Sequence, residues 1–145
     1  MLVGGDWQGT GDTRQARRVT MVPGARIEAS ATQNGDGGQV VLWSDVNNPD
    51  SVTSVNGSIQ AEAGPMGGDG GRVETSSYQL SVDDLQVSTR ANQGQAGQWL
   101  LDPYNITIST GTTTNGVTAS GGVYSTNTNS IINNTCLLYT SPSPR

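Results

Sequence analysis

The sequence predicts an all-β protein, a parallel β-helix (solenoid) in which short strands stack in successive coils. Composition gives the first indication, because the strand-favouring residues Val, Ile and Thr are common, whereas the helix formers Leu, Lys and Glu are scarce. The second is a unit of two alternating segments joined by a glycine-rich turn, which occurs three times. The third is the recurrence of small apolar residues on one face of that unit.

The three copies of the unit begin at Ala25, Gly57 and Leu85. Period-two spacing places three residues of each first segment on one face of a strand. These trios are Ile27, Ala29 and Ala31, then Ile59, Ala61 and Ala63, then Val87, Thr89 and Ala91. In the second segments, Val40 and Leu42 correspond to Val73 and Thr75, and then to Trp99 and Leu101. The repeated alanines predict a narrow interior in which strands face each other at short distance.

The glycine-rich turns lie at a spacing typical of stacked repeats. Gly38, Gly71 and Gly97 are 33 and then 26 residues apart (71 − 38 and 97 − 71), within the range of about 20–45 residues per solenoid unit. One copy alone could not bury its apolar face, whereas stacked copies can. Glycine adopts positive φ without steric cost, so we expect these residues to let the chain turn from one stacked strand to the next. An ordinary β-sandwich is the alternative fold.

The pattern divides the chain into three parts. Residues 1–109 are expected to form the β-helix repeats, although the pattern changes around Trp99. Residues 110–135 are rich in Thr, Asn and Ser, and two interpretations stay open, a continuation of the coils or a polar linker. Residues 136–145, which include the single cysteine, resemble a translated sequencing-adapter read-through, so we expect this tail to be non-native. The opening residues resemble the end of a strand already under way, which leaves open whether Met1 is a true start.

Charge and hydropathy argue against nucleic acid and membrane partners. The chain carries 12 acidic and seven basic residues, a net charge of −5, and all the basic residues are arginine. Such a chain has no electrostatic footprint for nucleic acid. The basic cluster of Arg14, Arg17 and Arg18 contains no interleaved aromatic residue, and we interpret it as a solvated turn. No stretch approaches the ~20 apolar residues of a membrane-spanning helix, and no signal peptide is expected at the start.

The residues offer little for catalysis. Histidine and lysine are absent, and the one cysteine lies in the tail, so the common general bases and nucleophiles are missing. Asp83 and Asp84 are adjacent and on a strand would point to opposite faces. Asp45 and Asp50 lie in a turn-rich stretch, and Asp102 precedes a proline and is expected in a turn. We therefore predict no catalytic residues and no enzyme.

The glycine-rich turns were considered as sites for a cofactor or a metal ion. Neither "NGDGGQV" nor "GGDGGRV" has the G-x-G-x-x-G spacing of a dinucleotide site, and both lead into a strand, so no cofactor is expected. Asp36 and Asp69 occupy equivalent turn positions and are the candidates for binding Ca²⁺. The third copy has Gln95 and Ala96 there, and the favoured interpretation is that each aspartate caps its own turn. No metal site is predicted.

Three tryptophans could contact a ligand. Trp99 falls at an inward position of the third copy, where core packing is expected. Trp43 has the opposite parity from Val40 and Leu42, so its ring is expected either at the surface or against a neighbouring loop. Trp43 is therefore the candidate contact residue.

The combination of four stretches resembles a filamentous haemagglutinin-type adhesin: "LVGGDWQG", "ARIEASATQNGDGGQVVLWSD", "GGDGGRVETSS" and "GQWLLDPYNITI". These large proteins of Gram-negative bacteria are secreted across the outer membrane by the two-partner pathway. The resemblance implies a right-handed parallel β-helix, truncated at both ends, and a location at the bacterial cell surface or outside it. It also implies an internal shaft segment without the secretion domain that an outer-membrane transporter recognises.

The implied function is structural, in that the shaft holds other regions of the adhesin away from the bacterium. The partners it implies are the two-partner transporter, through the missing secretion domain, and host-cell receptors or glycans. Two alternatives stay open. One is a fragment of a carbohydrate-active β-helix enzyme, and the other is a receptor- or glycan-binding module in its own right.

Overall fold

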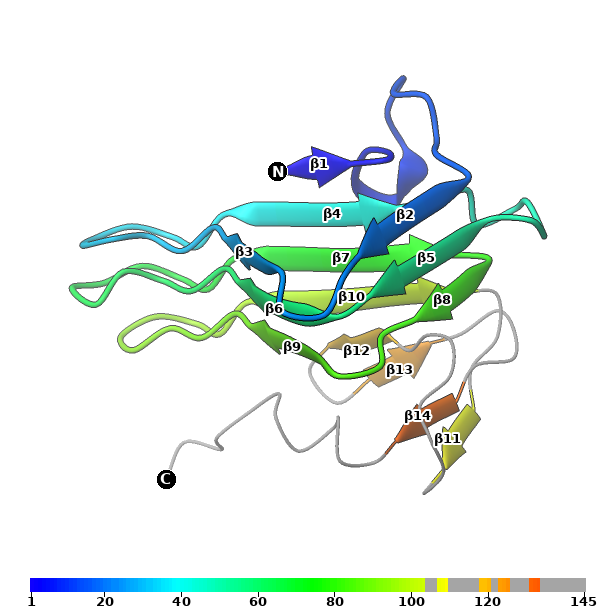
Figure 1. Ribbon diagram of the computed structural model, residues 1–145. Coiled ribbons are helices and arrows are strands. Elements are labelled where there is room, and N and C mark those ends of the chain that lie inside the picture. The colour runs from blue at the N-terminus through cyan, green and yellow to red at the C-terminus, as the bar shows by residue number, and fades with distance from the viewer. Residues whose placement is uncertain (104–106, 110–117, 121–122, 126–130, 134–145) are drawn as a thin grey trace.

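The computed structural model describes residues 1–103, 107–109, 118–120, 123–125 and 131–133, and in these the chain is almost entirely β-strand (Figure 1). A single turn of 3-10 helix, η1 (Trp7–Gly9), interrupts the strands of this part. The strands are β1 (Leu2–Val3), β2 (Arg18–Met21), β3 (Arg26–Glu28), β4 (Gln39–Trp43), β5 (Val52–Val55), β6 (Gly57–Gln60), β7 (Arg72–Ser77), β8 (Gln79–Ser81), β9 (Leu85–Ser88), β10 (Gln98–Pro103), β11 (Thr107–Ser109), β12 (Thr118–Ser120), β13 (Val123–Ser125) and β14 (Ile131–Asn133). Within the described residues, no helix is long and apolar enough to cross a membrane.

Consecutive strands from β2 to β10 are distributed in turn among three parallel sheets. Sheet I contains β1, β4, β7 and β10, sheet II contains β2, β5 and β8, and sheet III contains β3, β6 and β9. Every third strand is therefore a hydrogen-bonded neighbour. We refer to β2–β4, β5–β7 and β8–β10 as layers 1, 2 and 3.

The register between layers confirms the alignment of the sequence copies. Residues predicted to be equivalent are direct partners in adjacent strands. In sheet III the partners are Ile27, Ile59 and Val87. In sheet I they are Val40, Val73 and Trp99, and then Leu42, Thr75 and Leu101.

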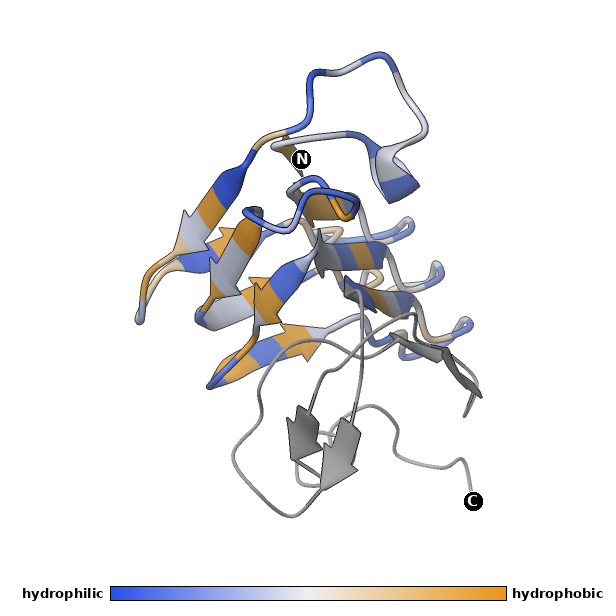
Figure 2. Ribbon diagram, turned by 90° about the vertical axis from the view of Figure 1, so that its right-hand side faces the viewer, coloured by the Kyte–Doolittle hydropathy of each residue, from blue (hydrophilic) through white to orange (hydrophobic). Residues whose placement is uncertain are grey.

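The hydrophobic core lies between the three sheets, and Figure 2 shows hydrophobic residues alternating with hydrophilic ones along the strands. Layer 2 supplies fully buried residues from each sheet, namely Val55, Ile59 and Val73. Ile27 and Val87, the partners of Ile59 in layers 1 and 3, are only half-buried. In sheets II and III the middle strand has a neighbour on both sides, whereas each outer strand has one. Burial of a side chain of this size contributes about 1.5–3 kcal/mol, so the middle layer is the most strongly stabilised.

Buried hydroxyl groups join the layers where sheets I and II meet. The Ser44 Oγ lies 2.8 Å from the Thr53 Oγ1 and 2.7 Å from the Ser77 Oγ. Thr53 also donates to the carbonyl oxygen of Ser76, at 3.1 Å. Each of these side chains is fully buried, and the mutual hydrogen bonds offset the cost of removing them from water.

The predicted small residues have a second role besides lining the interior. The core between the sheets consists mainly of Val, Leu, Ile and Met, and of the predicted alanines Ala61 is buried in it and Ala29 packs against it. These residues also lie where the chain leaves sheet III and later returns to sheet I, at the base of a projecting loop. There the N–H groups of Gly38, Gly71 and Gly97 donate to the carbonyl oxygens of Ala29, Ala61 and Thr89, over 2.7, 2.8 and 2.7 Å. Small side chains allow the two arms of each loop to approach this closely.

The glycines at these bases are also required for a reason other than the expected one. Gly38, Gly71 and Gly97 do not have positive φ, which occurs instead at residues such as Gly35, at 126°. A Cβ atom on Gly71 would lie 2.1 Å from the carbonyl oxygen of Gly38 in the preceding layer. A Cβ atom on Gly70 would lie 1.9 Å from the carbonyl oxygen of Thr89 in the next. Stacking of the backbones therefore excludes any side chain here.

The strands after β10 pair differently from those before it. β12 joins sheet I antiparallel to β10, and β13 is antiparallel to β12. β11 and β14 form a separate parallel pair. These short strands are the described parts of residues 104–135, and the predicted non-native tail, 136–145, lies outside the described residues.

Replacement of Gly70 by alanine is expected to lower the free energy of unfolding by about 3 kcal/mol, the upper end of the usual cost of overpacking, because the new methyl group meets backbone atoms that cannot move aside. Gly24→Ala is the matched control. Gly24 has φ of +80° and open space around its Cβ position, so that the cost is conformational alone, about 1 kcal/mol. Urea unfolding of both variants measures the difference, and an equal or smaller loss for Gly70→Ala would contradict the stacking argument.

Candidate functional site

Three glycine-rich loops project side by side from one end of sheets I and III (Figure 1). They comprise residues 30–37, 62–70 and 90–96, one from each layer, and we call them the loop stack. Backbone hydrogen bonds join them. The N–H of Gly35 donates to the carbonyl oxygen of Gly67 at 2.9 Å, and that of Gly70 donates to the carbonyl oxygen of Gln95 at 2.8 Å. The strand-like pairing of the layers thus continues into the loops.

The candidate metal ligands Asp36 and Asp69 form part of this pairing. The Asp36 Oδ1 accepts the backbone N–H of Asp69 at 2.8 Å, and the Asp69 Oδ1 accepts the backbone N–H of Gln95 at 2.8 Å. Each aspartate therefore binds the next loop, and the prediction that it caps its own turn is wrong. Within the described ranges, no group of three or more His, Cys, Asp or Glu residues is arranged to hold a metal ion.

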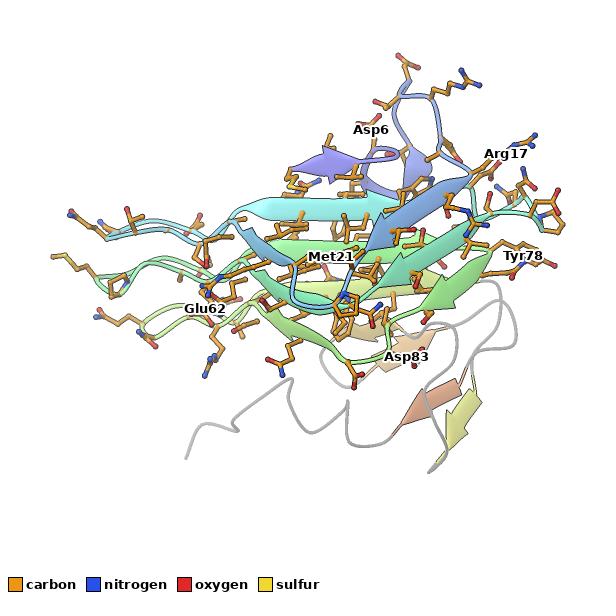
Figure 3. The ribbon with its side chains drawn as sticks, in the orientation of Figure 1. Asp6, Arg17, Met21, Glu62, Tyr78 and Asp83 are labelled. Carbon is orange, nitrogen blue, oxygen red and sulfur yellow. The ribbon has the colours of Figure 1, made fainter. Side chains whose placement is uncertain are left out.

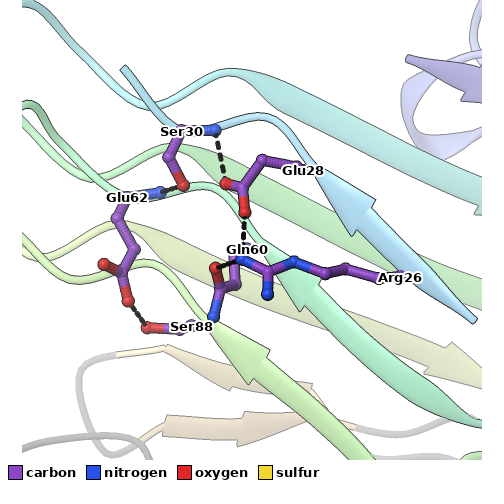
Figure 4. Close-up of polar contacts among 6 residues, drawn as sticks. All are labelled: Arg26, Glu28, Ser30, Gln60, Glu62 and Ser88. Atoms are coloured by element: carbon purple, nitrogen blue, oxygen red, sulfur yellow. Dashed lines mark hydrogen bonds and ion pairs between the residues drawn. The ribbon is translucent and has the colours of Figure 1, made fainter. Parts of the chain in front are cut away.

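The outer face of sheet III carries a network of polar side chains, shown in Figure 4. In the first half of the network, the Arg26 Nη2 donates to the Glu28 Oε2 and to the Gln60 Oε1, both at 2.6 Å. The Glu28 Oε1 accepts the backbone N–H of Ser30 at 3.2 Å. The bonds from Ser30, followed by the contact with Arg26, hold the pKa of Glu28 below its ordinary value. Both charged side chains are largely exposed, and such a pair contributes little to stability.

The second half of the network continues across the remaining layers. The Ser30 Oγ accepts the backbone N–H of Glu62 at 3.0 Å. The Glu62 Oε1 accepts the hydroxyl of Ser88 and, at 3.4 Å, the Nε of Arg90. These hydrogen bonds link side chains of neighbouring layers to one another. The arrangement presents polar atoms in rows but brings together no carboxyl pair suited to acid–base catalysis.

The outer face of sheet I is covered, in contrast to those of sheets II and III. Its outward side chains include Val41, Trp43, Glu74 and Leu100, and all four are buried. The cover over β4 and β7 is a loop of residues 5–15, which contains η1 and which we call the N-terminal loop. Figure 3 shows Asp6 in this segment, and the Asp6 Oδ2 accepts the N–H of Thr13 within it, at 3.1 Å.

Trp43 lies directly beneath the N-terminal loop. A Cβ atom on Gly5 would lie 2.4 Å from the Trp43 Cδ1, and one on Gly9 would lie 2.5 Å from its Cζ2, so that these glycines rest on the ring. The side chain is 2% exposed. The indole was predicted to lie at the surface or against a loop, and it lies against a loop. In this structure, therefore, no face of the candidate contact residue is open to a ligand.

Glu74 is the buried charge-bearing group beside Trp43. Its exposure is 0%, its Oε2 accepts the backbone N–H of Gln8 at 2.8 Å, and its Oε1 accepts the Ser76 hydroxyl at 2.9 Å. Burial raises the pKa of Glu74, the hydrogen bonds from Gln8 and Ser76 oppose this, and the negative charge of nearby Asp102 adds to it. Sequence reasoning missed Glu74, because its parity in β7 predicts a solvent-facing side chain.

Asp102 lies within β10 and is the register partner of Ser76, so the prediction that it belongs to a turn is wrong. Burial raises the pKa of this half-buried carboxyl. Asp102 and Glu74 therefore lie on the same face of adjacent strands. The structure thus places two carboxyl groups near each other that no sequence pattern pairs.

The other residues singled out from the sequence have structural roles. Asp45 accepts the backbone N–H of Asn47 at 2.9 Å in a turn between layers. Asp84, with φ of 57°, lies in the turn that joins β8 and β9, where Asp83 accepts the hydroxyl of Ser81 at 2.7 Å. Trp99 packs against the core as predicted, and its Nε1 donates to the Thr75 Oγ1 at 3.1 Å.

The chain was compared with known families and with curated proteins: no family model matches it, and no curated protein is significantly similar.

Asp69→Ala is expected to lower the free energy of unfolding by about 1 kcal/mol, the usual net value of one hydrogen bond, because the N–H of Gln95 loses its acceptor. Asp69→Asn is the matched variant, since its amide oxygen can still accept that bond. It is expected to retain most of the stability. Urea unfolding with and without EDTA measures the stability of both variants. We call the two hydrogen bonds that Asp36 and Asp69 accept from the next loop the aspartate ladder. A loss of stability on chelation would indicate that these aspartates bind a metal ion.

Glu74→Gln is expected to raise the free energy of unfolding at about pH 7. Because the folded-state pKa of Glu74 lies above its ordinary 4.5, its contribution to stability is fully present below that value and is lost as the pH rises through the folded pKa. Glutamine retains an oxygen for the Gln8 N–H and carries no charge, so the variant should lose this part of the pH dependence.

Urea unfolding from about pH 4 to about pH 8 measures the effect of Glu74→Gln. Glu28→Gln is the control, because Glu28 is exposed and its pKa is shifted in the opposite direction. If both variants shift the pH dependence alike, burial of Glu74 is not its cause.

Proposed function

We propose that this chain is a segment of a right-handed parallel β-helix and serves as part of the shaft of a large secreted or surface-exposed bacterial adhesin of the filamentous haemagglutinin type. Each layer is one coil of the solenoid. In this proposal the segment is structural and has no catalytic activity of its own. Its mechanism is mechanical, since every added coil lengthens the shaft and carries other regions of the adhesin further from the cell.

The single observation that carries the proposal is the distribution of strands among the three sheets. Equivalent residues of successive copies are partners in sheet I and in sheet III, and sheet II follows the same order of layers. A chain that returns to the same three sheets in the same order can add layers without limit. The half-buried outer members, Ile27 and Val87, support a fold that is extended by further layers.

The resemblance in the sequence supplies the biological part of the proposal. In this proposal the adhesin is secreted through an outer-membrane two-partner transporter. The partners of the adhesin are host-cell receptors or glycans, bound by regions that the shaft displays. The rival enzyme function is testable by incubation with polysaccharides and detection of new reducing or unsaturated ends.

Tandem duplication of residues 44–76 tests the solenoid. Trp43 and Ser76 are register partners, so the inserted copy begins in the position that its predecessor occupies. The variant is expected to be longer by one strand spacing, about 4.8 Å, and to melt at a higher temperature, because one more layer is covered on both sides. Small-angle X-ray scattering and thermal melting provide the two measurements.

Duplication of residues 44–75 is the matched control for this experiment. It is one residue shorter, and a shift of one residue turns the apolar face of each added strand outward. This variant is expected to lose stability or to aggregate. An unchanged maximum dimension in the in-register variant would contradict the proposal.

A further inference from the structure

The outer face of sheet I combines groups that do not serve the stacking of layers. The indole of Trp43, the carboxyl of Glu74 and the carboxyl of Asp102 lie on this face, on three adjacent strands. The Trp43 Nε1 is buried and has no hydrogen-bond partner among the described atoms. A buried N–H without an acceptor costs free energy comparable to a lost hydrogen bond, so its presence requires an explanation.

The N-terminal loop that covers Trp43 and Glu74 has the form of an Ω-loop. Its two ends meet where the N–H of Ala16 donates to the carbonyl oxygen of Gly4 at 2.7 Å, so that the loop can move while its ends stay joined. Gly4 has φ of 81°, a conformation available to few other residues, at one of these ends.

The loop is held to the sheet by few contacts. One hydrogen bond joins Gln8 to Glu74, and the Arg72 guanidinium lies 4.9 Å from the centre of the Trp7 ring. None of the residues of η1 is fully buried. Gln8 has φ of 53° and ψ of 24°, a left-handed conformation that costs a non-glycine residue about 1–2 kcal/mol. Few polar contacts with the sheet and local strain both lower the cost of opening the loop, whereas burial of the Trp43 ring beneath it opposes opening.

We propose that the N-terminal loop is a lid over Trp43 and Glu74, and that these two residues form a saccharide-binding platform together with Asp102 on the neighbouring strand. The structure is the closed state, and lifting of the loop uncovers the platform. The lid does not follow from the shaft function. With the lid open, one face of the shaft would itself bind glycans.

The chemistry of the platform favours a neutral saccharide. An indole face presents a flat apolar surface on which a sugar ring can stack, and its N–H supplies a donor for a sugar hydroxyl. Two carboxylates accept hydroxyl donors and repel anions. The three residues lie on adjacent parallel strands about 4.8 Å apart, a span that suits an extended chain of sugars better than a compact ligand.

Gly5→Ala is designed to hold the lid open, since the added methyl group would meet the Trp43 ring, while Gly5 itself does not have positive φ. Gln8→Pro opens the lid in a second way, because proline has no N–H for Glu74 and cannot adopt positive φ. In a background with Trp7→Phe and Trp99→Phe, acrylamide quenching reports exposure of Trp43. Far-UV circular dichroism confirms that each variant is folded.

Binding is measured by calorimetry with three neutral probes: hexasaccharides of β-1,4-glucose, β-1,4-N-acetylglucosamine and β-1,4-mannose. The lid-open variants are expected to bind at least one probe about tenfold more tightly than the unmodified chain, the population shift expected if opening costs about 1.4 kcal/mol. Adding Trp43→Ala is expected to abolish binding, and adding Asp102→Asn to weaken it. Gly24→Ala, distant from the platform, is the control and should bind as the unmodified chain does.

Two results would overturn the proposal. One is the absence of binding to all three probes by variants whose Trp43 is accessible to acrylamide. The other is binding that persists after Trp43→Ala. Neither result bears on the duplication experiment, which measures length and stability and tests the shaft function separately.

Discussion

The close stacking of backbone on backbone is the constraint on which the rest of the structure depends. Neighbouring strands of a sheet lie about 4.8 Å apart, and this chain maintains that spacing through the strands and into its projecting loops. Any residue that faces the adjacent layer at a point of closest approach must therefore lack a side chain. Gly70 and Gly71 meet this requirement in layer 2, between backbone atoms of the layers on either side. The aspartate ladder adds side-chain bonds to the same stacking, each from one loop to the next.

Much of this stacking could be predicted from the sequence, because period-two patterns and turn spacing are local properties. The columns that begin at Ile27 and Val40 follow from alignment of the copies alone. The reasons for individual residues could not be predicted as well. The glycines were expected to provide positive φ, yet they are needed for clearance between layers, and clearance depends on a partner that is distant in sequence. For the same reason, the acceptor role of Asp36 toward the next loop is not visible in its own turn.

The covered face of sheet I shows where parity reasoning fails. Alternation assigns one set of side chains to the core and the other to water, and by this rule Glu74 would face water, although it is buried. The strand sequences contain a signal against this assignment. β4 reads QVVLW and β10 begins QWLL, which are nearly continuous apolar runs, whereas β2 (RVTM) and β3 (RIE), in sheets II and III, alternate. Continuous runs are typical of strands buried on both faces. The four glycines within residues 4–11 were a second signal, since two of them, Gly5 and Gly9, allow the chain to lie directly on the Trp43 ring.

The burial of Glu74 requires an explanation, because an apolar side chain at this position could be buried without the cost of removing a carboxyl from water. A fully buried carboxyl costs free energy even when both of its oxygens accept hydrogen bonds, and a neighbouring carboxyl increases that cost. A glutamine would satisfy the same donor from Gln8 without the charge. Stability alone therefore does not account for a buried Glu74 with Asp102 nearby on the same face. A face that is exposed part of the time does account for it, because carboxylates in water carry no such cost and can bind hydroxyl groups. The same reasoning explains the unpaired N–H of Trp43, which has no acceptor while the loop covers it and gains one when the face is uncovered.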